Sequence, residues 1–112
     1  MTDFEHAFIS RRLALAIGWR EDQLFNEHDG SYTSVNLSSH PFIQTWKDFD
    51  YRDPLVIWPI AERFNCFPYA LRDKDQKLTG RWNAWASAGI DISADTAATA
   101  VALAVIKAKG SP

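Results

Sequence analysis

The sequence lacks the features that mark disulfide-bonded, low-complexity and membrane-spanning chains. Its single cysteine has no partner for an internal disulfide, so nothing in it requires an oxidising compartment. Five glycines and five prolines in 112 residues are too few for a collagen-like or low-complexity chain. The most apolar stretch, Ala97 to Ile106, has about half of the roughly 20 residues that a membrane-spanning helix needs. Because Met1 to Glu5 carry acids where a secretory signal carries Lys or Arg, the sequence predicts a cytoplasmic protein without membrane contact.

An excess of charge of one sign is also missing. The 12 Lys and Arg residues are balanced by 14 Asp and Glu residues, for a formal net charge of -2. This balance argues against a nucleic-acid partner that needs a basic surface, and against an acidic mimic of DNA. The glycines form no phosphate-binding loop, which excludes nucleotide hydrolysis of the P-loop type: Gly18, Gly30, Gly80, Gly89 and Gly110. With 46% apolar residues, a single domain spanning residues 1–112 can bury a core.

Signatures of catalysis and metal binding are sparse. No zinc-binding spacing links the three histidines or the cysteine: His6, His28, His40 and Cys66. His28 and Asp29 sit in a predicted turn, where a solvated pair is a simpler interpretation than a general base with its orienting carboxylate. Asp48, Asp50 and Asp53 cluster as magnesium ligands do, but Asp53 is already explained as a helix cap. The sequence predicts no catalytic residue, no metal and no cofactor.

Three segments have the composition and end signals of helices. The predicted helices cover residues 3–17, residues 54 to about 64, and a segment from near 93–95 to before Gly110. Gly18 can adopt the left-handed conformation that often ends a helix. Asp53 followed by Pro54 is a helix start, because the carboxylate accepts from free first-turn amides and proline suits the first helical position. Lys107 and Lys109 suit the negative end of the last helix dipole.

Strand patterns separate these helices. Residues 24–37 predict a hairpin around His28-Asp29-Gly30, and residues 67–71 and 78–86 alternate on either side of a polar turn. Residues 38–52 hold five aromatic and apolar side chains without a clear period, which indicates an ordered loop pinned by aromatics. The predicted order is α-β-β-α-β-β-α, an α+β fold with three helices and a short antiparallel sheet.

Several short motifs spread over most of the chain resemble the phage ABA sandwich domain proteins, small phage and prophage products that the NinX-like proteins of lambdoid phages also resemble. The matching residues are Leu15-Ala16-Ile17-Gly18-Trp19, Asp53-Pro54, Trp58-Pro59-Ile60, Gly80-Arg81-Trp82, Ala94-Asp95-Thr96-Ala97 and Ala102-Leu103-Ala104. Each is a cap, a turn or a core feature, and none is a catalytic signature. The resemblance implies an α-β-α layered sandwich encoded by a mobile genetic element, and residues 38–52 have no counterpart in its pattern.

The aromatic residues carry most of the functional signal. Five tryptophans exceed what the core of a small domain needs, and tryptophan is enriched at binding hot spots. Trp19, Trp58 and Trp82 coincide with the family-like motifs and are interpreted as structural. The predicted partner-binding residues are Trp46, Phe49, Tyr51, Arg81, Asn83 and Trp85. Two alternatives stay open for Arg81 and Trp85, namely stacking on a nucleobase with the arginine on phosphate, and ordinary packing under a helix.

The first helix has two apolar arcs, which suggests self-association. One arc holds Ile9, Leu13, Ala16 and Ile17, and the other holds Phe4, Phe8 and Leu15. The sequence predicts an isologous dimer through Phe4, Phe8 and Leu15, with a broadly buried helix as the alternative.

Taken with the phage resemblance, these features favour a non-enzymatic phage accessory protein. We expect it to bind and inhibit a host defence component, such as a CRISPR-Cas effector, because the chain is small, rich in aromatics and without catalytic motifs. The alternative is an oligomeric small-ligand binder, or sponge, for a nucleotide signal. A small phage enzyme is a third possibility.

Overall fold

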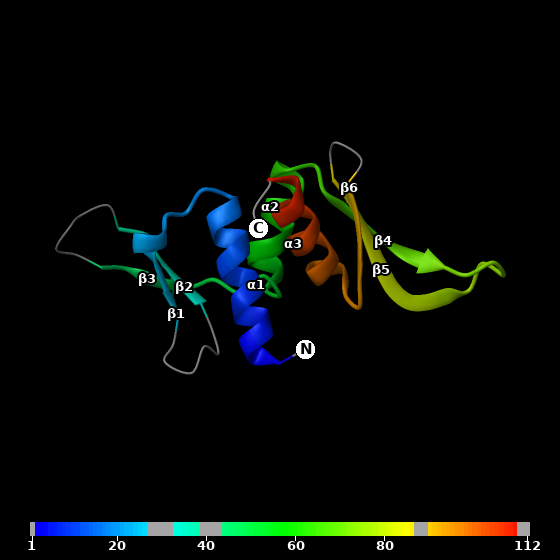
Figure 1. Cartoon of the computed structure of the whole chain (residues 1–112), viewed down its shortest axis with the longest axis horizontal. Helices are drawn as coiled ribbons and strands as arrows, with labels where there is room; N and C mark the ends of the chain where they lie inside the picture. The colour runs from blue at the N-terminus through cyan, green and yellow to red at the C-terminus, as the bar shows by residue number, and fades with distance from the viewer. Residues whose placement is uncertain (1, 27–32, 39–43, 87–89, 110–112) are drawn as a thin grey trace. The chain divides into compact units, whose positions relative to one another are not determined.

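The computed structural model describes residues 2–26, 33–38, 44–86 and 90–109 (Figure 1). It divides the chain into two compact units, residues 1–50 and residues 51–112. Unit 1 contains α1 (Asp3–Ala16), a 3₁₀ turn (Glu21–Gln23), β1 (Leu24–Asn26), β2 (Thr33–Asn36) and β3 (Trp46–Asp48). Unit 2 contains α2 (Pro54–Arg63), β4 (Phe67–Arg72), β5 (Leu78–Ala86), β6 (Ile90–Ala94) and α3 (Ala97–Ala108). The predicted α+β class, with three helices and antiparallel strand pairing, is confirmed.

Helix α1 begins and ends as its sequence predicts. The Thr2 hydroxyl accepts a hydrogen bond from the Glu5 amide at 3.2 Å, which satisfies one of the free amides of the first turn. Beyond the last helical residue, Gly18 has a φ of +115°, a conformation that side chains rarely allow. The glycine therefore ends the helix.

The first sheet is antiparallel in the order β1-β2-β3, and α1 packs against β2. Thr33 and Val35 are buried on one face, and the Thr33 hydroxyl donates to the Ala7 carbonyl of α1 at 2.9 Å. The predicted loop over residues 38–52 is wrong for β3, which pairs Trp46 with Asn36 and Lys47 with Val35. All three β3 residues are exposed, so they lack the alternation that reveals a strand in a sequence.

Unit 2 starts with the predicted cap of α2. The Asp53 carboxylate accepts from the Leu55 amide at 3.0 Å, and its backbone carbonyl accepts from both Val56 and Ile57. Buried residues Ile57 and Ile60 lie on one side of the helix, as the periodicity predicts.

The second sheet is antiparallel in the order β4-β5-β6 (Figure 1). The predicted hairpin is confirmed, and the Asp73 carboxylate holds its turn by accepting from the amides of Asp75 and Lys77. Pro68 lies in edge strand β4, where its missing N–H costs the sheet least. Strand β6 is absent from the predicted order, which places the start of the last helix near residues 93–95. Helix α3 begins later than predicted. Its N-cap is Thr96, whose hydroxyl accepts a hydrogen bond from the Thr99 amide.

Helix α3 packs on one face of this sheet. Ala100 and Ala104 are fully buried in the helix, as are Ala84 and Ala86 in β5. Small side chains on both elements let the helix approach the strand closely. Among the described residues, no helix combines the length and apolar character needed to cross a bilayer.

Cys66 is fully buried in this core and should be chemically inert. Its thiol lies 3.9 Å from the Val101 carbonyl, and burial raises the pKa of Cys66 from 9.0 to about 11. We therefore expect alkylation of the native protein at neutral pH to be much slower than alkylation in denaturant. The unfolded chain loses the thiol proton first, so the unfolding free energy should fall as pH rises from about 9 to about 11.

Denaturant titrations of the wild type and of Cys66→Ala, at neutral pH and at a pH near 10, measure this effect. The alanine variant should show a smaller loss of stability at high pH than the wild type. Equal losses, or fast native alkylation, would contradict the burial of the thiol.

Candidate binding surface on the open sheet of unit 2

The sheet β4-β5-β6 has one face covered by α3 and one open face. Its register pairs Phe67 with Trp85, and Trp85 in turn with Asp91 of β6. Since alternate residues point to the same side, Tyr69, Asn83 and Ser93 share this face with them. The intervening residues lie on the opposite face, where Ala84 and Ala94 are buried and Trp82 and Ile92 are half-buried. We call the side that carries Trp85 the open face.

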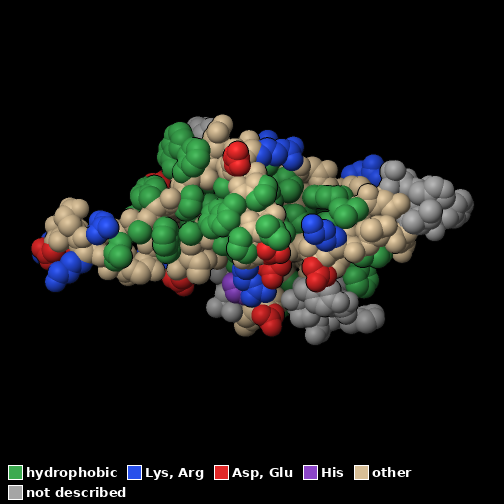
Figure 2. Space-filling model, turned by 180° about the vertical axis from the view of Figure 1, so that it is seen from behind, with side chains coloured by type: hydrophobic (Ala, Val, Ile, Leu, Met, Phe, Trp, Pro, Cys, Tyr) green, Lys and Arg blue, Asp and Glu red, His purple; other side chains and the backbone are tan. Residues whose placement is uncertain are grey.

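Three aromatic side chains lie on the open face. The exposed fractions of Phe67, Tyr69 and Trp85 are 56%, 46% and 47%. Phe67 and Trp85 are direct cross-strand neighbours, whose Cβ atoms lie about 5 Å apart in such a pair. Figure 2 shows hydrophobic side chains reaching the surface beside the charged end of the β4–β5 hairpin. Partly exposed aromatics grouped in this way are typical of an interaction surface.

A hydrogen-bond network fixes the polar side chains between these aromatics. The Asn83 side-chain amide donates to the Tyr69 hydroxyl at 2.7 Å and also to the Asp91 carboxylate. Asn83 itself is buried, so its amide holds the Tyr69 and Asp91 side chains from below the surface. Three strands thus contribute to one network that holds the tyrosine and the carboxylate in place, which lowers the entropy a partner must remove on binding.

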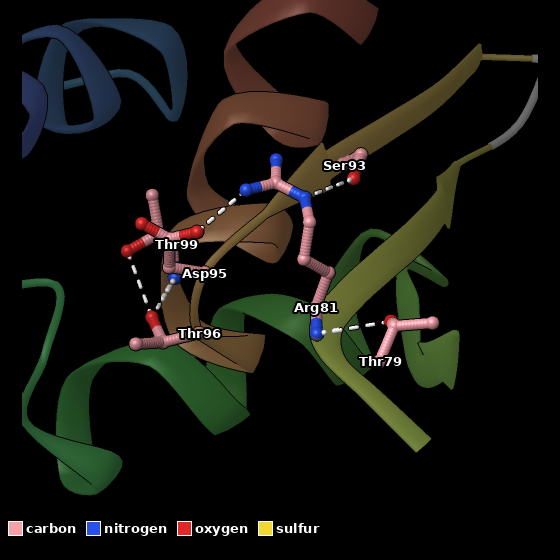
Figure 3. A network of polar contacts seen from close by, with 6 residues as sticks. All are labelled: Thr79, Arg81, Ser93, Asp95, Thr96 and Thr99. Atoms are coloured by element: carbon pink, nitrogen blue, oxygen red, sulfur yellow. Dashed lines mark hydrogen bonds and ion pairs between the residues drawn. The ribbon is translucent and has the colours of Figure 1, made fainter. Parts of the chain in front are cut away.

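Arg81 forms a second network of hydrogen bonds and an ion pair on the same face (Figure 3). Its guanidinium lies 2.5 Å from the Asp95 carboxylate and 3.3 Å from the Ser93 hydroxyl. The backbone amide of Arg81 donates to the Thr79 hydroxyl at 3.2 Å. Because its charge is balanced by Asp95, this arginine is a weaker site for phosphate than a solvated arginine would be.

The structure therefore brings together three of the predicted partner-binding residues, Arg81, Asn83 and Trp85. The sequence interpretation missed the cross-strand neighbours that complete the face: Phe67, Tyr69 and Asp91. The alternation over residues 67–71 indicates that Phe67 and Tyr69 are strand residues, and pairing across the polar turn places them on the same face as Trp85. Asp91 had no such signal, because β6 was not predicted.

Trp46 lies on a different sheet, β1-β2-β3 of unit 1. Its side chain is 41% exposed, and its ring centroid lies 6.0 Å from that of Phe25 on β1. The Trp46 indole N–H donates to the Gln44 side chain at 3.3 Å.

Two other residues from the predicted loop surface are not at the surface. Phe49 and Tyr51 are buried, and the Tyr51 hydroxyl is hydrogen-bonded to Thr99 of α3 at 3.1 Å. A buried side chain cannot contact a partner directly, so neither Phe49 nor Tyr51 forms part of the candidate binding surface. A buried tyrosine hydroxyl needs a hydrogen-bond partner, and Thr99 provides one for Tyr51.

The predicted dimer arc on α1 is partly exposed. Phe4 and Phe8 are exposed, Leu15 is half-buried, and the Arg12 guanidinium lies 5.7 Å from the centre of the Phe8 ring.

If these residues form an isologous interface, light scattering at tens of micromolar should give about twice the monomer mass of 12.7 kDa. Phe8→Ser should return the protein to a monomer, with Leu55→Ser as the matched control, because the Leu55 side chain is exposed on α2. A monomer mass for the wild type at that concentration would remove the dimer.

A cavity among the described residues of unit 2 is small. It lies near the end of α3, has a volume of about 80 Å³ and is lined by Phe64, Ala86, Val105, Ala108 and Lys109. Pockets for small molecules are about 300 Å³ or larger. Within the same residues, no three His, Cys, Asp or Glu side chains gather as metal ligands would. The predicted turn with His28 and Asp29, and also His40, lie outside the residues that the structure describes.

Comparisons with protein-family models, curated proteins and solved structures returned no match to this chain. The resemblance to the phage ABA sandwich family stays a prediction from the sequence motifs. The open face of β4-β5-β6 is therefore the feature on which a functional proposal depends.

Proposed function

We propose that this chain is a non-enzymatic protein-binding module whose contact surface is the open face of β4-β5-β6. The observation that carries the proposal is the group of half-exposed aromatics on that face, Phe67, Tyr69 and Trp85. Aromatic side chains bury large areas with few rotatable bonds, and they dominate the energy of protein interfaces. Asp91 and Arg81 lie beside these aromatics, with Asn83 beneath them, and supply the polar groups that such interfaces also contain.

In line with the phage resemblance, we propose that the partner is a host defence component, such as a CRISPR-Cas effector. The protein would act in the host cytoplasm by occupying a surface that the effector needs. No catalytic group is required for this mode of inhibition, which suits a chain without catalytic motifs.

The nucleotide-sponge alternative has less support. The cavity near the end of α3 is too small for a nucleotide, and Arg81 is paired with Asp95. The open face also carries Asp91, which repels phosphate.

A plaque assay tests the proposal. Phage are plated on a host strain that carries an active CRISPR-Cas system and expresses this chain. The wild type should raise the plaquing efficiency, and the double variant Phe67→Ala/Trp85→Ala should lose this effect while keeping its circular dichroism spectrum. Trp58→Ala is the matched control, since Trp58 is similarly exposed but lies on α2. If the wild type neither raises plaquing nor captures a stoichiometric host protein, the proposal is wrong.

A further inference from the structure

A row of three side chains with complementary chemistry crosses the open face at the end of the sheet where β5 finishes and β6 begins. Phe67, Trp85 and Asp91 are successive cross-strand neighbours on β4, β5 and β6. The indole is therefore flanked by a phenyl ring on one side and a carboxylate on the other. Tyr69 is the next aromatic along β4, and Asn83 connects its hydroxyl to Asp91.

Within the ranges that the structure describes, no ion pair joins the carboxylate in this row to a Lys or Arg side chain. Among the described residues, the hydrogen-bond partner of Asp91 is the neutral amide of Asn83. Arg81, the cation on the same face, is paired with Asp95. The open face thus has one negative charge in excess, beside an aromatic ring whose face attracts cations.

We propose that this row binds an arginine side chain of the partner protein. The planar guanidinium stacks on the exposed Trp85 indole and donates hydrogen bonds to the Asp91 carboxylate, which Asn83 holds in position. This proposal rests on the proposed function, because it takes the partner to be a protein, and it adds that the bound segment is basic. Nucleic acid fits poorly, since Asp91 and Asp95 would both face its phosphates.

Titration of the isotope-labelled full chain with a capped peptide tests the arginine site by NMR. The probe has one arginine between glycines and serines, and the comparison peptide replaces it with neutral citrulline of nearly the same shape. The arginine peptide should shift the Trp85 indole N–H and the Asn83 side-chain amide in a saturable manner. The citrulline peptide should bind more weakly, and added salt should reduce the difference.

Two variants separate the contributions of charge and ring. Asp91→Asn keeps an acceptor for Asn83 and should weaken the arginine peptide by about threefold, the scale of an exposed ion pair. Trp85→Ala should weaken it by about two- to fivefold, the scale of an exposed cation–π contact. Asp75→Asn removes the same charge at the tip of the β4–β5 hairpin and should leave the affinity unchanged.

Equal binding of arginine and citrulline peptides, or no effect of Asp91→Asn, overturns this proposal. So do shifts of the Trp85 indole that depend on protein concentration without peptide, since the occupant would then be a second copy of the chain. These results leave the plaque assay and host-protein capture unaffected. Conversely, arginine binding without any effect on plaquing or capture would support the row and overturn the proposed function.

Discussion

Tyr51→Ala should lower the unfolding free energy by about 3 to 5 kcal/mol, the largest effect that we expect of any single substitution considered. The side chain is fully buried, and its removal leaves a cavity in unit 2 that the neighbouring side chains fill only in part. The melting temperature should fall by at least about 10 °C. Denaturant unfolding, followed by circular dichroism, measures the loss.

Tyr51→Phe is the matched control for this prediction. It keeps the ring and removes only the hydroxyl that is hydrogen-bonded to Thr99, so it should cost about 1 kcal/mol. Thr99 retains its hydrogen bond to Thr96 in this variant. A Tyr51→Ala protein that is as stable as the wild type but fails to bind its partner would restore the original interpretation of Tyr51 as a contact residue.

Trp85→Ala should weaken binding of the captured host protein by about 30-fold, equivalent to the roughly 2 kcal/mol of a binding hot spot. The indole is half-exposed on the open face, so its removal should cost folding stability no more than about 1 kcal/mol. Binding is measured by interferometry on the immobilised partner, and stability by thermal melting of the same preparation.

Trp46→Ala provides a comparison on the other sheet. Trp46 is exposed to a similar extent and also neighbours a phenylalanine, but it lies on sheet β1-β2-β3 of unit 1. If the proposed surface is right, this variant should bind almost as tightly as the wild type. The opposite pattern, with binding lost in Trp46→Ala and kept in Trp85→Ala, would move the contact surface to β1-β2-β3.

Features decided by neighbouring residues could be predicted from the sequence. The cap at Asp53, the stop at Gly18 and the polar turn around Asp73 all depend on contacts within a few positions along the chain. The candidate face was partly accessible in the same way, because alternation along β5 places Arg81, Asn83 and Trp85 on one side.

Features decided by distant residues could not be predicted. Strand β3 is three residues long and exists through its pairing with β2, so no local pattern distinguishes it from a loop. The burial of Tyr51 depends on α3, whose Thr99 lies 48 positions along the chain. Asp91 belongs to the candidate site through the pairing of β6 with β5, which no pattern near Asp91 indicates.

The position of Pro68 bears on how a chain with an exposed aromatic surface avoids aggregation. Edge strands tend to pair with the edges of other molecules, and such pairing needs a continuous series of N–H donors. Pro68 removes one donor from β4, and the irregular register between Ala70 and Arg72 interrupts the strand again. The edge is therefore a poor template for sheet extension between molecules, while the aromatic side chains on the adjoining face remain free to meet a partner.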